Sequence, residues 1–89
     1  MKIKKLNPIK SAENVVFKCE RMNFLIKNKG SPSKEHTHEK IEHIFLVEGK
    51  IKLKVGNEIK IIDAPVKIEI PAKTKHKLIP ITNCKMLYY

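Results

Sequence analysis

The sequence has one arginine, no tryptophan, few other aromatic residues and no long apolar run. Arg21 is the single arginine among 19 basic residues, and aromatic residues make up 6% of the 89 positions. Nucleic-acid readers use arginine for bidentate contacts to bases and phosphates, and single-strand binders add stacking aromatics. The formal net charge of +10 is carried by lysines spread along the chain, so a nucleic-acid partner is the least favoured interpretation.

Membrane and secretion signals are also missing. No segment reaches the roughly 18 consecutive apolar residues of a membrane span. The start, residues 1–5, is basic but is not followed by the apolar stretch and small-residue cleavage site of a secretion signal. Cys19 and Cys84 lie far apart and match no metal or redox spacing. We therefore expect a cytoplasmic protein whose two thiols are reduced.

Helical periodicity is scarce, whereas short alternating runs bounded by turn residues recur. Gly56-Asn57 between two such runs predicts a two-residue hairpin. Prolines 32, 65, 71 and 80 fall at or beside the ends of the runs, as expected for strand boundaries. The predicted strands are Val15 to Lys18, Arg21 to Lys27, Glu42 to Glu48, Lys50 to Val55, Glu58 to Ile62, Val66 to Ile70, Lys75 to Ile79 and Lys85 to Tyr89.

Many short strands at close spacing predict an all-β fold, an antiparallel sandwich or barrel that protects its edges. We expect a single domain over residues 1–89, because the chain has the length of one domain. Such a short chain buries only roughly 60 to 65% of its unfolded surface, which makes dimerisation an option. Residues 1–14 are predicted to form an edge strand near Ile3 or a dimer arm.

Three of the four histidines lie within eight positions. Residues two apart on an extended strand face the same side, so His36 and His38 project together, Glu42 has the same parity, and His43 points elsewhere. Two imidazoles and a carboxylate are a natural donor set for a divalent transition metal. A later strand of a closed sheet can bring His76 opposite them, which would complete a site of three nitrogens and one oxygen.

Other kinds of site fit this segment poorly. A helical zinc-protease motif needs a second histidine where Glu42 stands, and His43 comes one place late. A zinc finger needs a close cysteine pair, which the chain lacks. The remaining alternative is that these histidines and carboxylates are surface residues of a charged loop.

Residues 30–49 carry a spaced set of glycines and metal-binding side chains: Gly30, five residues, His36-Thr37-His38, three residues, Glu42, six residues and Gly49. This pattern resembles the first conserved motif of the cupin superfamily at every defining position. The resemblance covers roughly residues 20–89 and implies a double-stranded β-helix, a jelly-roll-like β-barrel of two facing antiparallel sheets. It also implies that His36, His38 and Glu42 bind a metal inside the barrel.

The second cupin motif is only partly present. Pro71 and His76 stand at the expected positions, and the resemblance implies that His76 is the fourth metal ligand. Pro65, Lys73 and Pro80 replace the first glycine, the turn glycine and an asparagine of that motif. Glycine would allow a positive φ without steric cost, so Lys73 must either take a strained conformation or reshape the turn that aims His76.

Alternation along the strands predicts which side chains face the barrel interior. If Glu42 points inward, Phe45 and Val47 point outward and leave an apolar patch. Cupins commonly pair through such sheet faces, so we expect a homodimer. The side chains predicted to face inward are Met22, Phe24, Ile26, Ile44, Leu46, Cys84, Met86 and Tyr88.

The metal site leads to two hypotheses of different classes. A site of this kind leaves coordination positions open, so an ion such as Mn, Fe, Ni, Cu or Zn can polarise an oxygen of a small oxygen-rich substrate. The first hypothesis is therefore a metal-dependent enzyme, and the second is a metal- or ligand-binding module without turnover. Positive surface potential favours anionic metabolites as the ligand. Tyr88 is the one polar candidate for a proton donor with inward parity.

Overall fold

The computed structural model describes residues 1–11, 14–31 and 33–89, which form nine strands in two antiparallel sheets. The larger sheet has the order β1-β2-β3-β9-β4-β7, and the smaller has the order β6-β5-β8. The all-β prediction is confirmed. The strands are β1 (Ile9–Lys10), β2 (Asn14–Cys19), β3 (Met22–Lys27), β4 (Glu42–Glu48), β5 (Lys50–Val55), β6 (Glu58–Asp63), β7 (Val66–Ile70), β8 (His76–Pro80) and β9 (Cys84–Tyr88).

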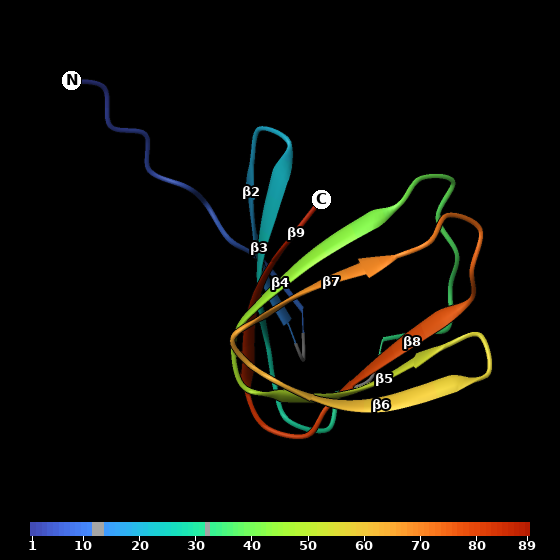
Figure 1. Ribbon diagram of the computed structural model, residues 1–89. Helices are drawn as coiled ribbons and strands as arrows, with labels where there is room; N and C mark the ends of the chain where they lie inside the picture. Colours follow the sequence, from blue (N-terminus) through green and yellow to red (C-terminus); the bar gives the residue numbers. More distant parts are fainter. Residues whose placement is uncertain (12–13, 32) are drawn as a thin grey trace.

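The two sheets face each other and are joined at one end of the barrel (Figure 1). Three connections cross between the sheets there: Gly49 after β4, residues 64–65 after β6 and residues 81–83 after β8. The hairpin after β5, the turn 71–75 and residues 36–41 lie at the opposite end. The barrel is therefore closed by tight corners at one end and bordered by longer loops at the other.

The predicted strand boundaries agree with the structure to within one residue. The hairpin at Gly56-Asn57 is confirmed, because Val55 pairs directly with Glu58 and Gly56 has a φ of 58°. The alternating lysines belong to a solvated face, since Lys52 is exposed between the buried Ile51 and Leu53. Within the described ranges, no helix is long and apolar enough to span a membrane.

The hydrophobic core lies between the sheets and draws on both. Burying one leucine or isoleucine side chain contributes roughly 1.5 to 3 kcal/mol to the stability of the fold, relative to leaving it exposed. The inward parity predicted for β4 and β9 is confirmed by the buried residues on those strands. The core consists of Ile44, Leu46, Ile51, Leu53, Ile70, Leu78, Cys84 and Met86.

The parity predicted for β3 is wrong. Leu25 and Lys27 line the interior cavity, whereas Met22 and Phe24 face the outside of the larger sheet. The predicted inward orientation of Phe24 and Ile26 would place Lys27 on the opposite, solvated face, but this residue is 4% exposed and donates from Nζ to Oδ1 of Asn14 at 3.2 Å. A lysine that points inward reverses the alternation on which the prediction depended.

Phe24 packs on the outer face of the larger sheet, where it completes an apolar row across neighbouring strands. It pairs with Phe17 on β2 and with Leu87 on β9, and Leu87 pairs with Phe45 on β4. The rings of Phe17 and Phe24 have centroids 6.2 Å apart. The outward orientation predicted for Phe45 and Val47 is confirmed, because both are less buried than their inward neighbours on β4.

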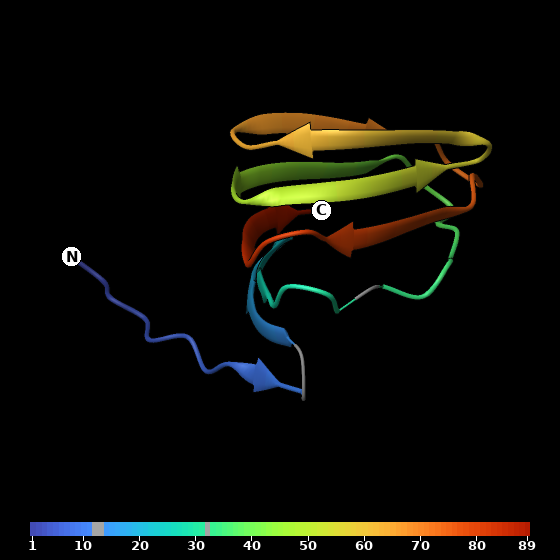
Figure 2. The same ribbon diagram turned by 90° about the horizontal axis from the view of Figure 1, so that it is seen from below.

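The N-terminal edge strand lies later than predicted. Ile3 is 88% exposed and belongs to no strand, whereas β1 at Ile9–Lys10 pairs with β2. Residues 1–8 extend away from the barrel (Figure 2). Positions 12 and 13 of the predicted edge strand or arm, and Pro32, which was predicted to lie at a strand boundary, are outside the described residues.

Gly49 makes the corner between β4 and β5 and has no room for a side chain. Its φ is 107°, and an added Cβ would lie 2.6 Å from the carbonyl oxygen of Asn83 and 2.7 Å from Sγ of Cys84. Gly56 also has a positive φ, but a Cβ there would meet nothing within 4 Å. A side chain at position 49 would therefore meet both a steric clash and backbone strain, whereas a side chain at position 56 would meet backbone strain alone.

We expect Gly49→Ala to lower the free energy of unfolding by about 3 kcal/mol or more, because overpacking adds to backbone strain. Gly56→Ala should cost only about 1 to 2 kcal/mol, the strain alone. Urea unfolding of both variants beside the wild type measures the difference. Equal losses in the two variants would contradict the packing argument at Gly49.

Candidate metal centre

Residues 30–31 and 33–38 are held along β8 by backbone hydrogen bonds. Gly30 donates to the carbonyl of Pro80 at 2.9 Å, and Ser33 donates to that of Leu78 at 2.9 Å. The Ser33 hydroxyl in turn accepts from the amide of Leu78 at 2.9 Å. The segment therefore extends the smaller sheet beyond β8, although most of it is not regular strand. The histidines of this segment therefore belong to a backbone that is hydrogen-bonded to β8.

His36 and His76 form an isolated antiparallel bridge. The amide of His36 donates to the carbonyl of His76 at 3.1 Å, and the amide of His76 donates back at 3.0 Å. Directly opposed residues in such a pair place their side chains on the same face. The two imidazole rings accordingly lie with centroids 4.1 Å apart. This bridge orients His76 toward the histidine pair.

Lys73 provides a second backbone connection, between the turn before β8 and the histidine segment. Its amide donates to the carbonyl of His38 at 2.7 Å, and its φ is 58°. Of the two outcomes predicted for this position, the structure has the strained one. A non-glycine residue in this conformation costs roughly 1 to 2 kcal/mol. The turn keeps its shape without the glycine found in the cupin motif.

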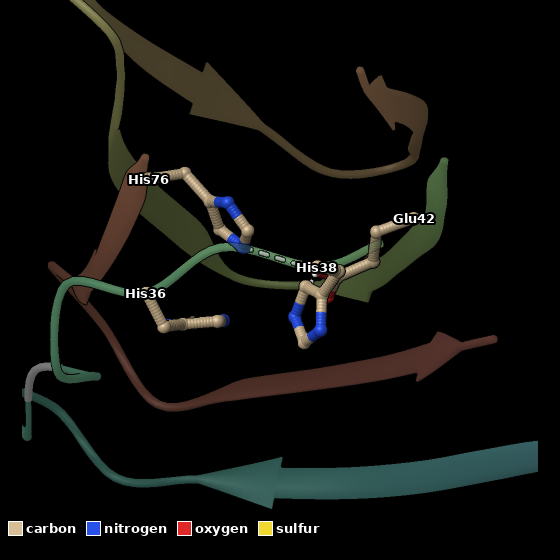
Figure 3. A group of neighbouring side chains, drawn as sticks. All are labelled: His36, His38, Glu42 and His76. Atoms are coloured by element: carbon tan, nitrogen blue, oxygen red, sulfur yellow. Dashed lines mark ion pairs between the residues drawn. The ribbon is translucent and has the colours of Figure 1, made fainter. Parts of the chain in front are cut away.

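The four predicted ligands converge on one point (Figure 3). Their donor atoms all lie within 4.8 Å of one another. We call His36, His38, Glu42 and His76 the ligand cluster. Ligands about 2.1 Å from one ion are at most about 4.2 Å apart, so a shift of a few tenths of an ångström per ligand would close the cluster around an ion. The predicted grouping is thus present in the geometry.

The histidine tautomers suit metal binding. Nδ1 of His36 contacts the carbonyl oxygen of Lys34, and Nδ1 of His76 contacts that of Thr74 at 3.0 Å. A carbonyl oxygen only accepts, so in the neutral rings both Nδ1 atoms carry the hydrogen and both Nε2 atoms carry a lone pair. Hydrogen bonds of this kind fix the orientation of metal-binding histidines.

At the centre of the cluster lie buried polar atoms that form no hydrogen bond with the described residues. Oε2 of Glu42 lies 3.0 Å from Nε2 of His76 and 2.9 Å from Nε2 of His38. Oε2 of Glu42 and Nε2 of His76 are nevertheless buried without a hydrogen-bond partner in the described part of the chain. Two lone pairs that face each other in a buried site are expected where a cation lies between them. The donor set therefore fits a divalent transition metal.

An ion pair without metal is the competing explanation for these short distances. It would require a protonated His76, whose side chain is only 3% exposed, next to Glu42 at 15%. Burial of a charged pair is stabilising only when its hydrogen bonds are well formed. The contact between these two atoms lacks hydrogen-bond geometry. The metal explanation accounts for this arrangement better.

A cavity of about 450 Å³ lies between the sheets, with the ligand cluster in its wall. Its size suits a small metabolite. His38, with a side chain 48% exposed, marks the route from solvent, whereas His76 is the most deeply buried ligand. The cavity is lined by the ligand cluster and by Asn14, Val16, Leu25, Lys27, Ser33, Lys34, Ile44, Leu53, Leu78, Met86 and Tyr88.

Tyr88 lines this cavity, as its predicted inward parity required. Burial raises the pKa of its phenol above the usual 10.0, and the negative charge of Glu42 raises it further. The hydroxyl therefore keeps its proton at neutral pH and can donate a hydrogen bond into the cavity.

The remaining predictions about single residues are also resolved. His43 points away from the cluster, as predicted, and stacks on Tyr89 on the outer face of the larger sheet. Its Nδ1 lies 3.7 Å from Oε1 of Glu69, whose pKa is lowered by the neighbouring Lys67. Cys19 and Cys84 are both free thiols, and burial raises the pKa of Cys84.

Sequence reasoning missed the polar part of the cavity that comes from β2, β3 and the following loop. Asn14, Lys27 and Lys34 all line the cavity. The pairing of Asn14 with Lys27 across β2 and β3 could not be derived from either strand alone. The available signal was the run Phe24-Leu25-Ile26, which is apolar on both faces and so leaves the parity of Lys27 open.

We expect Lys73→Gly to keep the metal content and to change the free energy of unfolding by less than about 1 kcal/mol. The relief of strain offsets the greater freedom that glycine gives the unfolded chain. Lys73→Val should lower the free energy of unfolding by about 1 to 2 kcal/mol, because a branched side chain fits this φ poorly. Urea unfolding and elemental analysis check both variants, with Lys75→Val as control. A loss of metal in Lys73→Gly would contradict this view of the turn.

The raised pKa of Tyr88 predicts a pH dependence. As the pH rises past about 10, the unfolded chain loses this proton before the folded protein does, so the free energy of unfolding falls until the folded pKa is passed. Tyr88→Phe should therefore lose less stability than the wild type between about pH 9 and pH 11. Urea unfolding at both pH values measures this, and lysine titration is common to both proteins. An identical fall would show that Tyr88 is not buried as described.

No protein-family model and no curated protein matches the sequence. Solved structures do match the fold. An RmlC-like cupin from Shewanella frigidimarina superposes with a TM-score of 0.81 at 16% identity, covering 94% of this chain and 81% of that protein. A cupin superfamily protein from Desulfitobacterium hafniense superposes with a TM-score of 0.72 at 11% identity, covering 99% and 78%.

An oxalate decarboxylase variant from Bacillus subtilis also superposes, with a TM-score of 0.76 at 11% identity. The alignment covers 93% of this chain but only 26% of that protein, so the likeness is to one part of it. Oxalate decarboxylase from Bacillus subtilis contains Mn(II) centres. At these identities the likeness concerns the fold alone. The fold of this chain is that of the cupin superfamily.

Proposed function

We propose that this protein binds one divalent transition metal through Nε2 of His36, His38 and His76 and through the carboxylate of Glu42, and that it acts on a small oxygen-rich metabolite. The observation that carries the proposal is the buried contact between Oε2 of Glu42 and Nε2 of His76, which leaves both lone pairs without a partner among the described residues. A metal ion satisfies both atoms at once.

The donor set leaves the choice among Mn, Fe, Ni, Cu and Zn open, since availability and geometry decide between them. The Mn(II) centres of a protein with the same fold support manganese as the first ion to try. When bound, such an ion supplies Lewis-acid polarisation of a substrate oxygen. The chain itself supplies the orientation of the ligands, through the carbonyls of Lys34 and Thr74 and the bridge between His36 and His76.

Two features of the cavity support action on a ligand within it. Apolar side chains, among them Ile44, Leu53 and Leu78, line the cavity together with the ligand cluster. Tyr88 holds a proton at the same wall, because its pKa is raised, and is the candidate to donate it to a bound molecule. A reaction that needs both an activated oxygen and a proton donor is compatible with these groups.

A binding module without turnover is the second candidate function. The observation that favours it is that Glu42, the carboxylate in the described cavity lining, belongs to the ligand cluster, so the described lining residues offer no separate carboxylate as a general base. In that case the metal and the cavity would hold a small ligand reversibly.

Cytoplasmic location and the homodimer stay predictions. The apolar row on the outer face of the larger sheet is where a second copy of the chain would pack.

We expect about one metal ion per chain in the wild type after purification without a tag or after reconstitution. The double variant His36→Ala, His38→Ala should lose it by tenfold or more, because two of four donors are removed. His43→Ala is the matched control, since this histidine lies on the outer face. Elemental analysis measures all three. A wild type that takes up no metal would overturn the proposal.

Turnover then separates the enzyme from the binding module. A substrate screen with the loaded wild type and with Glu42→Gln, which keeps the side-chain shape but weakens metal binding, compares the two candidates. Turnover that depends on Glu42 identifies an enzyme. Ligands that raise the melting temperature of the loaded protein without being consumed identify the binding module.

A further inference from the structure

The outer face of the smaller sheet presents three lysines close together. Ile51 and Leu53 of β5 belong to the core, so the alternation of the strand places Lys52 and Lys54 on the opposite, outer face. Lys54 pairs directly with Lys77 of β8, which therefore lies on the same face. Figure 2 shows the three strands of this sheet from that side, and no other described segment crosses in front of them. We call Lys52, Lys54 and Lys77 the lysine triplet.

The lysine triplet is not neutralised within the described part of the chain. Like charges directly opposite each other on neighbouring strands are destabilising, and the third lysine lies only about 7 Å away along β5. Two carboxylates of β6 are paired with other lysines, Asp63 with Lys50 at 3.5 Å and Glu58 with Lys60 at 3.0 Å. Glu35, one residue before the bridge to β8, forms no ion pair with the triplet among the described residues. The three ammonium groups are therefore left to solvent or to an external anion.

Apolar side chains flank these lysines on the same face. Ile61 and Ile79 pair with Lys52 from either side, and Ile59 pairs with Lys54. Ile59 and Ile61 are 55% and 57% exposed, and they lie on β6, the edge strand of the sheet. Adjacent exposed isoleucines on an edge strand favour association with a partner that covers them. The face thus combines positive charge with apolar surface.

An anionic lipid surface matches this combination better than a nucleic acid does. Nucleic-acid readers use arginine and stacking aromatics, and β5, β6 and β8 contain neither. A phosphate backbone also offers no apolar layer to the isoleucines. At the boundary between lipid headgroups and acyl chains, lysine ammonium groups lie at the phosphates while alkyl side chains enter the apolar layer. Because these side chains share one face, they can meet a bilayer together.

We propose that the outer face of the smaller sheet docks on the surface of an anionic membrane. The lysine triplet contacts the lipid phosphates, and Ile59 and Ile61 contact the edge of the acyl layer. The inference is independent of the metal site, because the ligand cluster lies between the sheets, on the inner side of β8. It also leaves the outer face of the larger sheet free for a second copy of the chain.

Sedimentation with lipid vesicles tests the docking of the full chain. Vesicles of phosphatidylcholine alone are compared with vesicles made of equal parts of phosphatidylcholine and phosphatidylglycerol. We expect the wild type to bind the anionic vesicles about tenfold or more tightly than the neutral ones, because each lysine near an anionic surface strengthens binding by about fivefold. This binding should weaken as the salt concentration rises, since salt screens charges at a surface. Equal binding to the two kinds of vesicle overturns the inference.

The double variant Lys52→Gln, Lys54→Gln should weaken binding to the anionic vesicles by about tenfold or more. The matched control is Lys67→Gln, Lys85→Gln, which removes the same charge from exposed positions of the larger sheet and should weaken binding by less than about threefold. Unfolding transitions check that both variants fold. Losses of equal size in the two double variants would show that net charge acts without this face, and would overturn the inference.

The isoleucines give a second readout, which separates docking on lipid from attraction to any anion. Ile59→Ser, Ile61→Ser keeps the charge of the face and should weaken binding to the anionic vesicles by about threefold or more. Unchanged binding of this folded variant overturns the role of the acyl layer. Fluorescence anisotropy with a labelled DNA duplex and with labelled polyglutamate, at the same salt concentration, compares other anionic partners. Tighter binding of the wild type to either of them than to the anionic vesicles also overturns the inference.

Discussion

The antiparallel bridge between His36 and His76 is the contact on which the candidate site depends. Two backbone hydrogen bonds join a loop segment to the first residue of β8, and they bring two imidazoles to the same face of the sheet. The adjacent bonds from Gly30 and Ser33 to β8 fasten the rest of the segment. Backbone pairing of this kind is independent of side-chain type, so it tolerates substitution in the turn before His76.

This explains why a degraded second motif is compatible with an intact ligand cluster. The turn glycine of the family allows a positive φ at no cost, and here Lys73 adopts that φ as a non-glycine residue. The strain is stored at one position, while the amide of Lys73 still holds the carbonyl of His38. Pro80, at the far end of β8, is buried and accepts from Gly30 through its carbonyl, a bond that does not require its missing amide. The departures therefore change local strain more than they change the direction of His76.

The cavity combines two environments that are costly to place together. Ligand-cluster atoms and a lysine need polar or charged partners, whereas much of the remaining cavity wall is apolar. Each polar group is oriented by a specific contact: Lys27 by Asn14, His36 by Lys34 and His76 by Thr74. Groups that are oriented before a ligand arrives lose little freedom when it binds, and this preorganisation favours selective binding.

The sequence by itself determined the strand boundaries, the hairpin at Gly56 and the orientation of β4 and β9. These features depend on local alternation and turn chemistry, which operate over a few residues. It also indicated His36, His38, Glu42 and His76 as ligands, through parity and the spacing of the motif. The sequence could not show which side chains of β3 face inward, because a stretch that is apolar on both faces carries no parity signal.

Tertiary structure alone decided three things: that Lys27 points inward, that Phe24 joins an outer apolar row, and that the edge strand lies at Ile9–Lys10 and not near Ile3. Each depends on a partner from another strand, such as Asn14 for Lys27 or Phe17 for Phe24. Cross-strand pairing joins residues distant in sequence, so a pattern read along one strand does not contain it.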